Sequence, residues 1–422
     1  MRTPDLRRSV RQLAGPTAGY IIVGSSAFAF LASGPRLLGP DGYSDQAVAW
    51  MIVMIFASGL AVPGELTVNS AAAEGSARAA QTRVRTLLLL TSTPFLVCLA
   101  LSLGGGSVMG VSEPVWWAGV CLAVFAYALS SGVRGRLGGQ GGYVAYGSVL
   151  AIEGASRIVL LAIAWVFKGD TTVLVWLLAL AIGGPVVLSG VVAAVWLHKT
   201  ETGVDVPTAH HPASKFGPIT VIAVSMQVVL GSAPLWLNSQ PGVDPATAGL
   251  FVSVASYMRV PLLVTSGTTI VVLSRSSSAV ASRDTVALKS TLTHHLALVG
   301  GAAAGLSMVL IAVSPIGLRL LYGPAIGGEV GGAVLVTMAL ATVLIAVGTV
   351  ANQTLVACHR AREAAGVWVA AAVITTLGLS LGATSLLGAS VAVLAGVTFG
   401  AVVAIAAAPW VMREVHREHV AP

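Results

Sequence analysis

Twelve apolar runs recur along the chain and limit what it can fold into. A helix of about 20 apolar residues crosses the hydrocarbon core of a membrane, and the runs lack the alternating polarity of a membrane β-barrel. We therefore predict an all-α, multi-pass membrane protein with about 12 transmembrane helices. The runs cover residues 12–35, 45–67, 86–104, 114–133, 143–166, 171–197, 215–237, 247–273, 295–315, 333–357, 366–384 and 388–411.

The composition agrees with a chain embedded in lipid. Of the 422 residues, 56% are hydrophobic and 9% are charged, whereas about 25% of an ordinary soluble domain is charged. The mean hydropathy is +0.88. These values exclude a soluble enzyme, a disordered protein and a nucleic-acid-binding domain, although the formal net charge is +7. The lipid bilayer is the expected partner, and nucleic acid is not.

The positions of the basic residues predict the orientation of the chain. Eighteen of the 23 Lys and Arg residues lie at the two ends or in even-numbered connections, Arg134 and Arg136 among them. Only Arg36, Lys168 and Arg319 lie in odd-numbered connections. Because cytoplasmic loops are enriched in Lys and Arg, we predict that both termini are cytoplasmic.

The amino-acid composition and the first apolar run indicate the kind of organism and the membrane in which we expect the protein. Nineteen of the basic residues are Arg, and Ala, Gly and Val are abundant, as in proteins of GC-rich bacteria. The apolar run from Leu13 to Ser33 is too long for a typical signal peptide, so we interpret it as an uncleaved first span. The expected location is the bacterial cytoplasmic (inner) membrane.

A polar stretch from His198 to Ser214 divides the chain into two halves of six spans each. The predicted domains are an N-terminal lobe at 1–197, a cytoplasmic linker at 198–214 and a C-terminal lobe at 215–422. Because both halves begin on the same side, they would form parallel repeats about a pseudo-two-fold axis along the membrane normal.

No motif indicates catalysis. The chain shows no phosphate-binding loop, metal-ligand cluster or catalytic triad, and Cys98, Cys121 and Cys358 are spaced as isolated apolar residues. We therefore expect no enzyme activity, metal or cofactor. A membrane-embedded glycosyltransferase or glycan polymerase is an alternative, since Asp41 and Asp45 share a face near the outer side. The outer loops are short, which favours turn formation and helix capping instead.

Three ionisable residues lie near the middle of predicted spans. Each costs about 2.5–3.5 kcal/mol at the centre of a membrane helix. Glu153 and Arg157 are four residues apart, so they share a helix face and either form a structural pair or contact cargo. Arg259 has no such intrahelical partner, and Pro261 frees the Tyr257 carbonyl beside it. The structural alternatives for Arg259 are snorkelling towards the interface and bonding to the carbonyls of a broken helix.

The three residues leave one surplus positive charge, which suits a phosphate or diphosphate group. Glu65 would cancel this charge if it faced inward, and an interfacial position is the alternative. Gln227 is a further polar group within a span, which either contacts cargo or satisfies an interhelical hydrogen bond.

Four short motifs resemble, in order along the chain, motifs of the bacterial polysaccharide flippases. This family belongs to the multidrug/oligosaccharidyl-lipid/polysaccharide (MOP) exporter superfamily. The motifs are Arg36-Leu37-Leu38-Gly39-Pro40-Asp41-Gly42-Tyr43, the stretch from Ala248 to Pro261, Leu320-Leu321-Tyr322-Gly323-Pro324, and Asn352-Gln353 followed by Arg360 and Arg362. Members often carry an acidic residue near the outer end of the seventh span, where this chain has Asn238.

The resemblance implies two six-helix lobes around a central cavity. It also implies alternating access that moves an undecaprenyl-diphosphate-linked oligosaccharide outward for polysaccharide export, alongside other polysaccharide-assembly membrane proteins. Cavities in the family are typically cationic, which suits Arg259 and Arg157. The candidate substrate-binding residues are Arg259, Arg157, Glu153, Arg36 and Gln227. A small-molecule exporter of the same fold and a structural role in an assembly complex are the alternatives.

Overall fold

Helices make up nearly all of the described chain, and no strand is present among the described residues. The chain divides into two compact units, Met1–Phe216 and Gly217–Pro422. The computed structural model describes the ranges 6–65, 113–140, 142–200, 216–244, 246–263, 282–323 and 330–420, with a few single residues between them.

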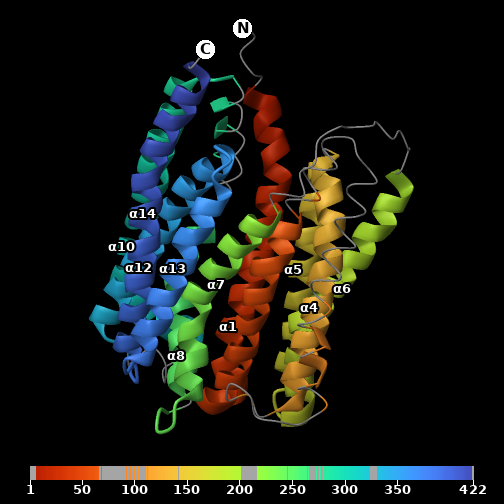
Figure 1. Ribbon diagram of the computed structural model, residues 1–422. Helices are drawn as coiled ribbons and strands as arrows, with labels where there is room; N and C mark the ends of the chain where they lie inside the picture. The colour runs from red at the N-terminus through yellow and green to blue at the C-terminus, as the bar shows by residue number, and fades with distance from the viewer. Residues whose placement is uncertain are drawn as a thin grey trace. The chain divides into compact units, whose positions relative to one another are not determined.

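The first unit is coloured from red to yellow-green in Figure 1. In it, α1 packs against α5, and α4 packs against α6. The observed α5 has the bounds that the apolar run at 143–166 predicts. The helices are α1 (Leu6–Phe56), the short π-helix η1 (Ala57–Ala61), α4 (Pro114–Gly139), α5 (Tyr143–Val166) and α6 (Thr171–Thr200).

Two spans within α1 are joined by a very short turn. Gly39 has φ 75° and ψ 176°, a left-handed conformation that interrupts the helix, and glycine adopts it without the steric cost of a side chain. The turn predicted between the first two spans is therefore present, and Gly39 is the residue of α1 with non-helical dihedral angles. It separates the candidate spans Ala18–Gly39 and Gly42–Glu65.

Glycines allow the helices of the first unit to approach closely. A Cβ at Gly119 of α4 would lie 2.6 Å from the carbonyl oxygen of Ala179 in α6. On the other pair of helices, a Cβ at Gly19 of α1 would clash with the backbone of Gly147 in α5. Small residues at such seams let membrane helices gain contact where lipid provides no hydrophobic driving force.

The second unit, from green to blue in Figure 1, uses the same kind of packing. There α14 packs against both α12 and α13, and a Cβ at Gly348 of α12 would lie 3.1 Å from Ala401 of α14. The helices are α7 (Phe216–Ser239), α8 (Ala246–Met258), α10 (Thr285–Tyr322), α12 (Gly332–Ala357), α13 (Ala361–Ser380) and α14 (Leu386–Val420).

Ten helices in the described part of the chain are long and apolar enough to cross a membrane. The protein is thus a multi-pass membrane protein, as the apolar runs predict. The expected spans at 86–104 and 247–273 are not among the ten, because many of their residues lie outside the described ranges. The described part of the second contains α8, a turn at Arg259 and further helical residues from Val260 to Leu263.

Candidate functional site

Four charged side chains are buried together in the interior of the first unit. Glu65 follows η1, Arg134 lies on α4, and Glu153 and Arg157 lie on α5. Their exposed fractions are 7%, 5%, 1% and 0%, in that order. Burying a charge is costly unless an opposite charge and hydrogen bonds compensate it. The contacts among the four residues therefore decide what the cluster does.

Glu65 faces the interior and pairs with Arg134. Nε of Arg134 donates to Oε2 of Glu65 at 2.9 Å, and the Tyr146 hydroxyl donates to Oε1 of the same carboxylate. The hydroxyls of Tyr20 and Tyr146 lie 2.8 Å apart. A chain of hydrogen bonds thus runs from the partly exposed Tyr20 to the buried Arg134.

Glu153 lies between two arginines. Its Oε1 accepts from Nη2 of Arg157 at 3.1 Å and from the Tyr127 hydroxyl at 3.0 Å. Its Oε2 lies 3.5 Å from Nη1 of Arg134. The pair that the four-residue spacing of Glu153 and Arg157 predicts is therefore formed, and Arg134 joins it to Glu65.

Arg157 also satisfies a backbone carbonyl on another helix. Its Nε donates to the carbonyl of Ala181 in α6 at 3.1 Å, and its Nη1 donates to Oγ of Ser26 at 3.0 Å. Four residues after Ala181 comes Pro185, which has no N–H to offer this carbonyl. The guanidinium lies 5.4 Å from the centre of the Trp50 ring. Arg157 thus replaces the missing backbone donor.

The cluster carries no net charge, since two carboxylates face two guanidinium groups. Assigning Arg134 to the connection after the fourth span was wrong, because α4 continues to Gly139 and buries this side chain. The apolar run ends at residue 133, so run length alone placed Arg134 outside the membrane. Without Arg134, the Lys and Arg residues are still concentrated at the two ends and in the even-numbered connections.

A polar stripe in the sequence could have revealed Arg134. Arg134 Nη1 and Nη2 lie 3.4 and 3.3 Å from the hydroxyls of Ser130 and Ser131, and Tyr127 lies one turn earlier. Residues three and four apart share a helix face. Polar groups at 127, 130, 131 and 134 on an otherwise apolar helix therefore mark an interior face.

Arg259 lies in the second unit, where it also meets a carbonyl that a proline leaves free. Its Nη2 donates to the carbonyl of Leu230 in α7 at 2.6 Å. Four residues after Leu230 comes Pro234, which lies inside α7 and cannot donate to that carbonyl. Arg259 is half-buried, and among the described residues no carboxylate pairs with it.

The remaining candidate residues lie apart from these contacts. Gln227 is half-buried on α7, three residues before Leu230 and thus on the same helix face. Arg36 is exposed near the turn of α1 at Gly39. Ten residues of α1 separate it from Ser26, the partner of Arg157, which is about 15 Å along a helix. The structure thus joins Glu153 to Arg157 and places Arg36 away from both.

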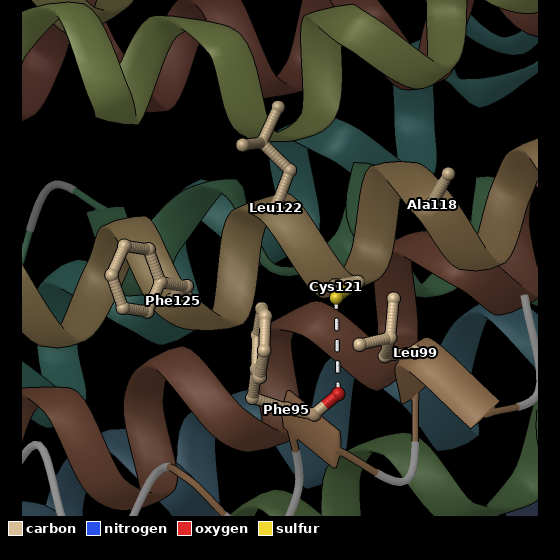
Figure 2. Close-up of a pocket in the computed structure, with 6 residues that line it drawn as sticks. All are labelled: Phe95, Leu99, Ala118, Cys121, Leu122 and Phe125. Carbon is tan, nitrogen blue, oxygen red and sulfur yellow. Dashed lines mark hydrogen bonds between the residues drawn. The ribbon is translucent and has the colours of Figure 1, made fainter.

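Two hollows in the described part of the chain are apolar. One, of about 250 Å³, is shown in Figure 2, where Cys121 Sγ of α4 lies 3.8 Å from the Phe95 carbonyl. The other, of about 290 Å³, lies between α7 and α13 and includes Val228 and Val373. Neither is lined by a charged residue, so neither offers an anion a partner.

Comparison with solved structures finds the same fold in membrane transporters. No protein-family model and no curated protein sequence matches the chain. Among solved structures, an inward-facing multidrug resistance MATE family transporter of the MOP superfamily superposes with a TM-score of 0.69 at 15% identity. The match covers 95% of this chain and 96% of that one.

Two further solved structures agree. A MOP superfamily transporter from Pyrococcus furiosus Vc1 matches with a TM-score of 0.70 at 17% identity, covering 96% of this chain and 95% of that one. A eukaryotic MATE transporter matches with a TM-score of 0.71 at 14% identity, covering 97% and 99%. The chain has the MOP transporter fold. That fold has 12 helices in two lobes, as the twelve apolar runs predict.

Proposed function

We propose that the protein is a membrane transporter that moves a polyprenyl-diphosphate-linked oligosaccharide across the bacterial cytoplasmic membrane by alternating access. The fold supports transport, because the matched structures are MOP superfamily transporters along nearly their whole length. The nature of the cargo is argued from the buried charges, since a shared fold does not specify a substrate.

The observation that carries the proposal is the half-buried Arg259, which no carboxylate among the described residues neutralises. A positive charge within a span costs about 2.5–3.5 kcal/mol, and such residues in membrane helices are usually functional. A guanidinium binds phosphate oxygens through two parallel hydrogen bonds. A diphosphate group would neutralise Arg259 during transport and would leave the apolar tail in lipid.

The other candidate residues have supporting roles in this proposal. Gln227, one turn before Leu230 on α7, would bond to sugar hydroxyls. Arg36, exposed near the predicted outer turn at Gly39 within α1, would attract the diphosphate electrostatically as it leaves. Glu153 and Arg157 already neutralise each other, so we assign them to the scaffold that supports the first unit.

A small-molecule exporter is the second candidate. It is favoured by the description of one matched structure as a multidrug resistance MATE family transporter. The two candidates differ in cargo charge and in the need for a lipid tail, so one reconstituted system can compare them.

The test uses the purified full chain in liposomes that contain a fluorescent short-chain polyprenyl-diphosphate disaccharide. Transfer between leaflets is followed with a membrane-impermeant quencher. We expect transfer at least tenfold faster than in protein-free liposomes. Arg259→Ala should abolish the gain, while Arg259→Lys should retain part of it because the charge remains.

Arg319→Ala is the matched control, since Arg319 is an exposed arginine of the same unit on α10. It should transfer cargo at the rate of the unsubstituted protein. Transport of a cationic dye without any transfer of the diphosphate lipid would contradict the flippase and support the exporter.

A further inference from the structure

Prolines inside helices leave carbonyls without their backbone donor, and this protein satisfies them in two ways. In α10, Pro315 frees the carbonyl of Ile311, and the Ser314 hydroxyl of the same helix donates to it at 2.8 Å. In α7, Pro234 frees the carbonyl of Leu230, and the donor comes from a different segment of the chain. The first solution is local, whereas the second fixes a distant arginine.

The bond to Leu230 uses only part of the Arg259 side chain. A guanidinium has five N–H groups, and each of its two two-donor edges includes one hydrogen of Nη2. A single bond from Nη2 to a carbonyl therefore occupies one edge at most. The Arg259 side chain makes no other hydrogen bond with the described residues, so one complete edge remains to bind two oxygens of an anion.

We propose that Pro234 is a positioning residue for anion binding, because it frees the Leu230 carbonyl that orients the Arg259 guanidinium. The remaining edge then binds two oxygens of a diphosphate. This inference rests on the proposed function and adds to it how the anion contact is prepared. If Pro234 were replaced by a residue with an N–H, the Leu230 carbonyl would bond within α7 and release Arg259.

The expected effect follows from side-chain entropy. A long arginine side chain that is already held in one orientation loses less freedom when it binds a ligand than a free one does. Pre-orientation of one such side chain is worth roughly two- to tenfold in affinity. The size of this effect suits a positioning residue, since loss of Arg259 itself would remove the contact altogether.

The experiment measures the Kd of the full chain in lipid nanodiscs for farnesyl diphosphate, a short polyprenyl diphosphate. Pro234→Ala should weaken binding by roughly two- to tenfold, while the Tm stays the same or rises because α7 regains a hydrogen bond. Weaker binding without loss of Tm is a combination that a purely structural role would not produce. Pro315→Ala is the control, and its Kd should not change.

Two outcomes would overturn the inference. If Pro234→Ala binds the probe as tightly as the unsubstituted protein while Arg259→Ala does not bind it, positioning by Pro234 is wrong and the proposed function stands. If the unsubstituted protein and Arg259→Ala bind the probe equally, the proposed function fails and the inference fails with it.

A stability comparison provides an independent check. Arg259→Ala should lower the Tm when residue 234 is proline, because the Leu230 carbonyl then has no donor. It should have little effect on the Tm in the Pro234→Ala background. Equal effects in both backgrounds would contradict the inference. If Pro234→Ala fails to fold, Pro234→Ser restores the same backbone N–H. It would then take the place of Pro234→Ala in both the Kd and the Tm measurements.

Discussion

Arg157 in the first unit and Arg259 in the second each donate to a carbonyl four residues before a helix proline, that of Ala181 and that of Leu230. Their surroundings differ. Arg157 is fully buried and paired with Glu153, whereas Arg259 is half-buried and its side chain bonds only to a neutral carbonyl among the described residues. The same contact to a backbone carbonyl is therefore made once by an arginine in a neutral cluster and once by an arginine without a counter-ion.

This difference separates two roles that look alike in the sequence. An arginine in a span is costly in either position. In the first unit its counter-ion is built into the fold, so the cost is offset whether or not cargo is present. In the second unit the described residues supply no counter-ion, and for this reason we propose an anionic ligand there. The variants below test whether the two arginines can be made alike.

The largest expected effect comes from removing the acid of the first unit. Glu153→Ala leaves the buried Arg157 without its carboxylate, and loss of one partner of a buried pair costs about 3–5 kcal/mol. Arg157→Met should cost a similar amount. The free energy of unfolding, measured by denaturant titration of the purified protein in detergent, reports both.

The double variant Glu153→Ala/Arg157→Met is the control for this prediction. It removes both charges at once, so it should be more stable than the two single losses added together. Strict additivity of the two changes would show that the pair does not act as a unit.

A smaller effect should follow from giving Arg259 an acid of its own. Ser256 is half-buried and lies three residues before Arg259, which is within reach on a helix face. Ser256→Glu should weaken binding of farnesyl diphosphate at least tenfold, or about 1.4 kcal/mol, because the new carboxylate competes for the guanidinium. Ser256→Gln has a similar size without the charge and should bind normally; an equal loss there would indicate a steric effect.

The smallest effect concerns an exposed ion pair whose N–O distance equals that of the buried pair of Arg134 and Glu65. Arg360 and Glu363 lie 2.9 Å apart, as Arg134 and Glu65 do, but their side chains are 28% and 50% exposed rather than 6% and 9%. Arg360→Ala should therefore cost less than about 1 kcal/mol, and Arg134→Ala several times more. Similar losses of unfolding free energy for both variants would show that burial does not decide the strength of these pairs.

Much of the fold could be predicted because apolar runs, turn glycines and prolines act locally. The runs at 143–166 and 333–357 match α5 and α12 within one residue. The pair of Glu153 and Arg157 was also predictable, since four-residue spacing is a local property of a helix. The orientation in the membrane and the role of the candidate cargo residues stay predictions.

The partners of these charges could not be predicted, because they depend on packing between distant segments. Glu65 and Arg134 are 69 residues apart, and no periodicity links them. The bond from Arg259 to Leu230 spans 29 residues, and the spacing of Pro234 after Leu230 becomes meaningful only once the arginine is located. The sequence shows which carbonyls lack a donor, and the three-dimensional structure shows which side chain supplies it.

The length of α10 has a practical consequence. Its 38 residues extend about 57 Å, while the hydrocarbon core is about 30 Å thick. Even a tilt of about 40°, the upper limit for membrane helices, leaves a substantial part of the helix outside this core. The polar end that begins at Thr285 therefore extends beyond this core into water, and a fluorophore attached there would report changes in the tilt of α10.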